Sequence, residues 1–165
     1  MYNNENRHNN QRNRPRPVSE YEEKIVDVAR VTRVVKGGRR MRFRVLVVIG
    51  NKKGRIGAGI AKGSEVPTAM RKAIETAKKK MLDVVITDSG SIPHETRARY
   101  SASEIVLFPA PEGSSLVSGG TARTVLELAG YKNIVSKSLG SNNKLNCVFA
   151  TLEALENLKK RNLTQ

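Results

Sequence analysis

Residues 41–49 restrict the fold more than any other part of the chain, because apolar side chains occupy every second position from Met41 to Ile49. The opposite face begins with Arg42 and Arg44 and continues with two apolar residues. Alternation over this length predicts a half-buried strand of an antiparallel sheet. Turns that contain glycine bracket the run at 36–39 and 51–54, which predicts a strand partner on each side.

The neighbouring segments predict a small sheet covered by one helix. The expected elements are a short helical turn at 19–24, strands at 25–35 and 55–62, a helix at 65–82 and a closing segment at 83–92. The strands are predicted from β-branched content and from alternation. The helix is predicted from apolar residues at helical spacing, with Ser64 as its N-cap and Pro67 tolerated in the first turn.

Gly57 and Gly59 fall on one face of the third expected strand. Glycine weakens an isolated strand, because it adds entropy to the unfolded chain and packs nothing. Its presence at two alternate positions predicts that something approaches this face closely. That neighbour is either the following helix or a nucleic-acid backbone, and both interpretations stay open. The glycine spacing fits neither a dinucleotide-binding fingerprint nor a Walker A loop.

A second unit is expected beyond residue 90. Its predicted elements are a strand at 104–108, a small-residue loop at 113–120, a helix at 121–129, a strand at 133–137 and a final helix capped by Asn142. Prolines at 109 and 111 end the first strand, and Gly130 ends the first helix. The chain is therefore assigned to the α+β class, with two small domains. Its predicted parts are a disordered basic arm at 1–19, a nucleic-acid-binding domain at 20–90 and an α+β domain at 91–165.

The formal net charge of +15 predicts a polyanionic partner, because each phosphate neutralised releases condensed counterions. The excess is concentrated in residues 1–90, which hold 21 Lys or Arg and 9 Asp or Glu, against 9 and 6 in residues 91–165. A solvated surface is the ordinary explanation of a charge run. Here the cations recur in neighbouring turns with almost no acid between them, which favours RNA. The residues predicted to bind RNA are the cations of this region with the two glycines of the turn: Arg30, Arg33, Lys36, Gly37, Gly38, Arg39, Arg40, Arg42, Arg44, Lys52, Lys53, Arg55 and Lys62.

Nothing in the sequence predicts catalysis, a cofactor or a metal site. Cys147 is the only cysteine, which excludes a disulfide within the chain, and His8 and His94 lack the partners that a metal site or a triad needs. No signal peptide or membrane span is expected, so the chain is predicted to be cytoplasmic. The loop 109–115 is similar to the phosphate-binding loop of galactokinase-like small-molecule kinases, but no acidic base accompanies it. A small-molecule substrate is therefore not expected.

The chain as a whole resembles bacterial small-subunit ribosomal protein five over about residues 20–160. The matching stretches are VARVTRVVKGGRRMRF (28–43), VVIGNKKGRIGAGIAKGSEVPTAMRKAI (47–74), IPHE (92–95), FPAPEGSSLVSGGTARTVLELAG (108–130) and SKSLGSNN (136–143). Their order and spacing are far more specific than any single motif.

The resemblance implies an N-terminal domain similar to a double-stranded-RNA-binding domain and a C-terminal domain with a left-handed βαβ crossover. It also implies a structural role in the small subunit, bound to its ribosomal RNA, with parts in assembly, decoding accuracy and the channel through which messenger RNA enters. Ribosomal proteins four and eight and the messenger RNA are the implied partners. The loop 32–40 matches the family's loop near the spectinomycin site, and this match adds Thr32 to the predicted RNA-binding residues.

The implied surface toward protein four lies around residues 104–123. Its predicted members are Glu104, Glu112, Gly113, Ser114, Ser115 and Arg123. The arm at 1–19 is outside the family's shared pattern, and Arg97 and Arg99 are more basic than the family leads one to expect, so their targets stay open. A free-standing double-stranded-RNA-binding regulator is the alternative function. Such a regulator would usually keep a full helix before its first strand, which this sequence barely offers.

Overall fold

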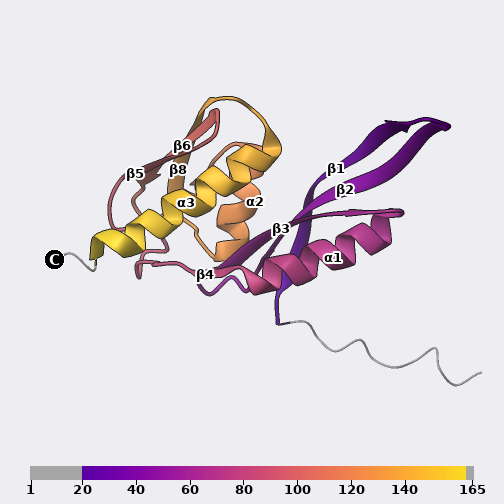
Figure 1. Ribbon diagram of the computed structural model, residues 1–165. Coiled ribbons are helices and arrows are strands. Elements are labelled where there is room, and N and C mark those ends of the chain that lie inside the picture. Colours follow the sequence, from indigo (N-terminus) through magenta and orange to yellow (C-terminus); the bar gives the residue numbers. More distant parts are fainter. Residues whose placement is uncertain (1–19, 163–165) are drawn as a thin grey trace, which may run out of the picture.

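The computed structural model describes residues 20–162, so the expected arm at 1–19 lies outside the described residues. Figure 1 shows two units side by side, a sheet with one helix and a second sheet with two helices. This confirms the predicted α+β class with two domains. No helix of the described part is long and apolar enough to cross a membrane.

The first unit is an antiparallel sheet in the order β1-β2-β3-β4 with helix α1 packed on it. Its elements are β1 (Glu22–Val35), β2 (Gly38–Gly50), β3 (Arg55–Gly63), α1 (Val66–Lys79) and β4 (Met81–Asp83). The helical turn expected at 19–24 was wrong where the structure describes it, because Glu22 to Lys24 pair with β2 as a strand. The end predicted for the helix was also wrong, since Met81 and Leu82 leave it to pair with β3.

The N-cap predicted for α1 was displaced by one residue. The capping position is Glu65, whose backbone is extended and whose side chain makes no capping hydrogen bond. Pro67 lies in the first turn, as expected, where its missing amide hydrogen leaves no helical bond unmade.

Helix α1 is the close neighbour of Gly57 and Gly59, which decides between the two interpretations left open by the sequence. A Cβ atom on Gly57 would lie 2.7 Å from the backbone oxygen of Ala77, and one on Gly59 would meet the backbone oxygen of Ala73. The helix contributes only alanines at its buried positions, Ala69, Ala73 and Ala77. Small residues on both partners let the helix backbone rest almost directly on β3.

The second unit has the sheet order β5-β6-β8-β7. Its elements are β5 (Thr96–Tyr100), β6 (Ser103–Pro109), β7 (Leu116–Val117), α2 (Gly120–Ala129), β8 (Ile134–Gly140) and α3 (Lys144–Asn162). Strand β7 runs parallel to β8 and is joined to it through α2, which forms the expected βαβ unit. The handedness of this crossover stays a prediction. Strands β5 and β7 were not predicted. The cap of α3 is Asn143 instead of the predicted Asn142, since the Asn143 side chain accepts from the amide of Leu145 at 3.2 Å.

The two units share one hydrophobic core. From Val45 to Gly50 strand β2 is buried on both faces, so the prediction of a half-buried strand was wrong for this stretch. Val45, Val47 and Ile49 pack toward α1, whereas Leu46 and Val48 join a cluster that includes residues of α2 and α3. The second unit thus covers the face that a lone domain would have exposed to solvent.

The turn between β2 and β3 caps the C-terminal end of α2. The amide of Lys52 donates to the backbone oxygen of Leu128 at 3.0 Å, and the amide of Gly54 donates to that of Ala129 at 2.9 Å. Carbonyl groups at the end of a helix otherwise lack partners, so the turn supplies them. Gly130 follows in a left-handed conformation, with φ of 106°. This contact fixes the first unit relative to the second through backbone atoms.

Candidate RNA interface

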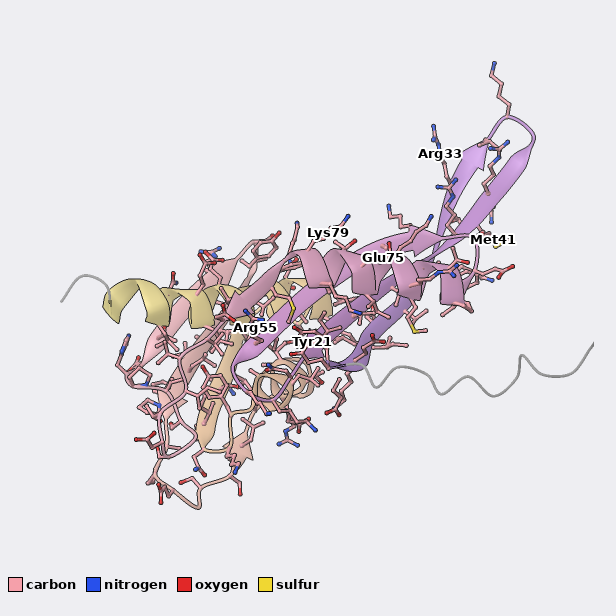
Figure 2. All side chains as sticks on the ribbon, turned by 90° about the horizontal axis from the view of Figure 1, so that it is seen from below. Tyr21, Arg33, Met41, Arg55, Glu75 and Lys79 are labelled. Carbon is pink, nitrogen blue, oxygen red and sulfur yellow. The ribbon has the colours of Figure 1, made fainter. Side chains whose placement is uncertain are left out.

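A two-stranded ribbon projects from the first unit. Strand β3 pairs with β2 only as far as Phe43, which lies opposite Gly63, so β1 and β2 continue beyond it with no third strand. Figures 1 and 2 show this ribbon extending away from the body of the molecule. Lys36 and Gly37 form the turn at its tip, and Gly38 has φ of 138°, a conformation that favours glycine.

The ribbon and the strands that continue from it are basic without interruption. Residues 28–64 contain 11 Lys or Arg and no Asp or Glu. Most of these cations form no ion pair with any residue of the described part: Arg30, Arg33, Lys36, Arg39, Arg40, Arg42, Lys53 and Lys62. All eight are exposed. Guanidinium groups make forked hydrogen bonds to phosphate, and lysine adds a mobile point charge, so this surface suits a phosphate backbone.

Three of the predicted RNA-binding residues are instead held by acids of the same chain. Arg44 lies 3.7 Å from Asp27, Lys52 pairs with Glu22, and Arg55 donates to Asp83 at 2.7 Å. The bond with Asp83 also raises the pKa of Arg55. These three residues lie at the base of the ribbon and near the α2 junction. The predicted cations thus divide into three that are paired near the body and eight without an ion pair in the described part, most of which lie on the ribbon, whereas Lys53 lies in the β2–β3 turn and Lys62 in β3.

The two faces of the ribbon differ in composition. On one face Arg33 lies directly opposite Arg40, and Arg42 and Lys62 follow on the same side. These four cations and Val31, Thr32 and Val35 line a hollow of about 280 Å³. On the other face Val34 lies opposite Arg39 and Thr32 lies opposite Met41.

A further basic surface on α1 was left out of the predicted site. Its exposed cations are Arg71, Lys72, Lys78, Lys79 and Lys80, the last of them at the helix cap. Glu75 is the only acid among them, and Figure 2 labels it beside Lys79 on the outer side of the helix. The signal was present in the sequence, because these cations occupy the positions between the apolar residues of the expected helix. Lys78 and Lys79 also lie in the last turn, where they stabilise the helix dipole.

Five of the six residues predicted to face protein four lie together around one loop, and Glu104 lies apart from them. Glu112 to Ser115 lie in the exposed turn after β6, and Arg123 of α2 donates to the backbone oxygen of Leu116 at 3.4 Å, just beyond that turn. Glu104 lies near the start of β6, five residues before its end, which is roughly 17 Å along a strand. It pairs with Arg97, and this bond lowers the pKa of Glu104.

The two arginines of β5, whose targets the sequence left open, both make contacts within the chain. Arg99 donates to the backbone oxygen of Ser101 at 3.1 Å, whereas Arg97 pairs with Glu104.

Among the residues that the structure describes, no group of three His, Cys, Asp or Glu side chains is placed to hold a metal ion.

Comparison with known proteins agrees with this architecture. The model of the ribosomal protein S5 N-terminal domain matches residues 21–85, and that of the S5 C-terminal domain matches residues 98–164. The chain belongs to the ribosomal protein S5 family. It is 52% identical over 140 residues to small ribosomal subunit protein uS5 of Campylobacter jejuni, covering 85% of this chain and 95% of that protein. It is 49% identical over 139 residues to uS5 of Thermotoga petrophila, covering 84% and 78%.

Membership of the S5 family confirms the resemblance seen in the sequence. The protein is a structural constituent of the small ribosomal subunit and not an enzyme, and in bacteria such proteins are located in the cytoplasmic ribosome. Small ribosomal subunit protein uS5c of Emiliania huxleyi is also similar, at 49% identity over 140 residues, covering 85% of this chain and 88% of that protein. The domain limits at residue 90 and the individual site residues stay predictions.

Proposed function

We propose that the protein binds small-subunit ribosomal RNA chiefly through the projecting ribbon. The proposal is supported by residues 28–64, a stretch of 37 residues that contains 11 cations and no acid. Much of this stretch extends away from the body of the protein (Figure 1). A surface of this charge attracts phosphate over a long range and binds it at close range. The loop at 32–40 forms the tip and is the part proposed to reach RNA near the spectinomycin site.

The alternative, a free-standing regulator that binds double-stranded RNA, differs in where the protein is found. We expect the native protein to co-sediment with small ribosomal subunits in a cell extract, and to be released only by salt high enough to strip ribosomal proteins. A regulator would sediment with free RNA or near the top of the gradient. Recovery of most of the protein away from small subunits, at low salt, would favour the regulator.

Removing charge from the ribbon should weaken RNA binding and reduce its dependence on salt. Each phosphate contact contributes about −0.9 to the slope of log K against log salt on a duplex, and about −0.7 on a single strand. The double variant Arg39→Ala and Arg40→Ala should therefore flatten the slope by roughly one to two units. The measurement is a titration of the protein with small-subunit ribosomal RNA at several salt concentrations.

A matched control removes the same charge elsewhere. Lys132 and Lys137 are exposed lysines of the second unit, outside the ribbon. Their double replacement by alanine should leave the slope closer to that of the wild type. Equal slopes for the ribbon variant and the wild type would mean that Arg39 and Arg40 remain in solvent when RNA binds.

The finer roles of the protein are also proposals. We infer contact with ribosomal protein four through the turn at 112–115 and Arg123, because these residues are exposed and adjacent in the structure. Glu104 fits this surface less well, since it lies on another part of the second sheet. Contact with protein eight, support of assembly and decoding accuracy, and a place beside the messenger RNA channel rest on the family resemblance.

A further inference from the structure

Three exposed arginines dominate one face of the projecting ribbon, and exposed apolar side chains lie between arginines on the other. Val34 is 75% exposed and Met41 is 55% exposed. Both lie on the face opposite to Arg33, Arg40 and Arg42, as the strand register requires. Figure 2 labels Arg33 and Met41 on the part of the hairpin that stands away from the body.

The apolar side chains are neighbours and not isolated. Val34 lies directly opposite Arg39, and Met41 is two residues beyond Arg39 on the same face of β2. Diagonal neighbours of this kind lie roughly 7–8 Å apart in an antiparallel pair. Neither side chain reaches the apolar cluster under α1, which stops at Val45 on this face of β2. They form a small apolar surface flanked by Arg30 and Arg39.

The opposite face of the ribbon is cationic. Four cations, Arg33, Arg40, Arg42 and Lys62, surround the hollow of about 280 Å³, with Val31 and Val35 also among its lining residues. No described acid pairs with any of the four. Like charges held this close repel one another, and a phosphate group between them relieves the repulsion.

An RNA partner matches both faces, because it carries anionic phosphates and also apolar surfaces on riboses and bases. Arg30 and Arg39 make the apolar face cationic as well, so a polyanion with apolar surfaces of its own fits it better than a neutral apolar protein segment. We propose that the ribbon lies between two segments of RNA, with phosphates of one segment on the Arg33–Arg40–Arg42–Lys62 face and riboses or bases of the other on the Val34–Met41 face. This inference rests on the proposed function. It assigns the ribose or base contacts to Val34 and Met41, and Arg30 and Arg39 beside them are assigned to phosphates of the same RNA segment.

The two faces should respond differently to substitution. In titrations with small-subunit ribosomal RNA, the double variant Arg40→Gln and Arg42→Gln should flatten the salt slope by roughly one to two units. The double variant Val34→Ser and Met41→Ser should lower affinity about tenfold at every salt concentration, since each buried methylene contributes about a factor of four. The salt slope of this second variant should equal that of the wild type.

Chemical probing of the same complexes locates the contacts on RNA. Backbone cleavage by hydroxyl radicals should show protected riboses in two separate RNA segments with the wild type. The arginine variant should lose protection in one segment, and the Val34→Ser and Met41→Ser variant should lose it in the other. Val117→Ser removes a similarly exposed side chain, 52% exposed, from the second unit and serves as the control that leaves both segments protected.

The outcomes separate this inference from the proposed function. If the wild type does not bind small-subunit ribosomal RNA in a salt-dependent way, the proposed function fails. If the wild type binds but the Val34→Ser and Met41→Ser variant keeps full affinity and both protected segments, only the two-segment arrangement fails. Loss of salt dependence in that variant would likewise overturn the assignment of faces. Circular dichroism of each variant, unchanged from the wild type, excludes unfolding as the cause.

Discussion

Replacing Gly59 with valine is expected to lower the free energy of unfolding by about 3 kcal/mol, the upper part of the range for overpacked cores. A Cβ atom at this position would meet the backbone oxygen of Ala73, and the amide nitrogen of Ala77 would lie 2.6 Å away. Backbone atoms of a helix cannot rotate aside as a side chain does. Relief requires α1 to move off the sheet, which opens the cluster that it forms with Val45 and Val47. Urea denaturation followed by circular dichroism measures the change.

Gly37→Ala is the matched control. A Cβ atom on Gly37 would meet no other atom within 4 Å, and Gly37 is not among the residues with positive φ. This variant should change the free energy of unfolding by less than about 0.5 kcal/mol. A Gly59→Val protein as stable as the wild type would mean that α1 does not rest on β3 as closely as the structure has it.

Gly59 also shows where prediction from the sequence stopped. Alternation identified β3, and helical spacing identified α1, but neither pattern says which partner covers the glycine face. The ambiguity was between a helix and a nucleic acid, and only the three-dimensional placement of α1 resolved it. Helices and strands with regularly spaced apolar residues were predicted well, because that spacing is visible in the sequence. The contacts between these elements were not predicted, because the spacing does not specify them.

The elements that were missed carry little apolar signal. Strand β5 exposes Arg97 and Arg99 on one face and buries only small side chains, Thr96 and Ala98, on the other. Strand β7 is two residues long. Strand β5 forms because it pairs with β6, and β7 forms because it pairs with β8. The residues of a short segment do not show which other strand it will pair with.

The candidate site was predicted as a region more reliably than as a set of residues. The density of cations pointed to the ribbon. Ion pairing could not be foreseen, because Asp27 and Glu22 reach Arg44 and Lys52 through pairings across the sheet and the junction. The division into two faces needed the register of β1 against β2, which a bulge between Ile25 and Asp27 shifts by one residue.

Leu46→Ala should destabilise both units together, by roughly 2–5 kcal/mol, the usual range for a leucine truncated in a core. Leu46 is 2% exposed, and it belongs to the strand of the first unit that faces the second. It lies in one cluster with Leu126 and Leu128 of α2 and Leu155 of α3, so its loss leaves a cavity between the units. Urea denaturation should show one transition at lower urea concentration. Hydrogen exchange should show amides of β2 and β6 losing protection in parallel.

The parallel loss is the informative part, because it separates a shared core from two independent ones. Residues of both units enter the same cluster, and the β2–β3 turn supplies hydrogen bonds to the end of α2. When the contact weakens, each unit exposes apolar surface that the other had covered, so neither gains by staying folded alone. Val117→Ala, at a position that is 52% exposed, is the control that should leave the transition within about 0.5 kcal/mol of the wild type. Two separate transitions in Leu46→Ala, with β6 amides still protected after β2 has exchanged, would contradict the shared core and show that the second unit folds by itself.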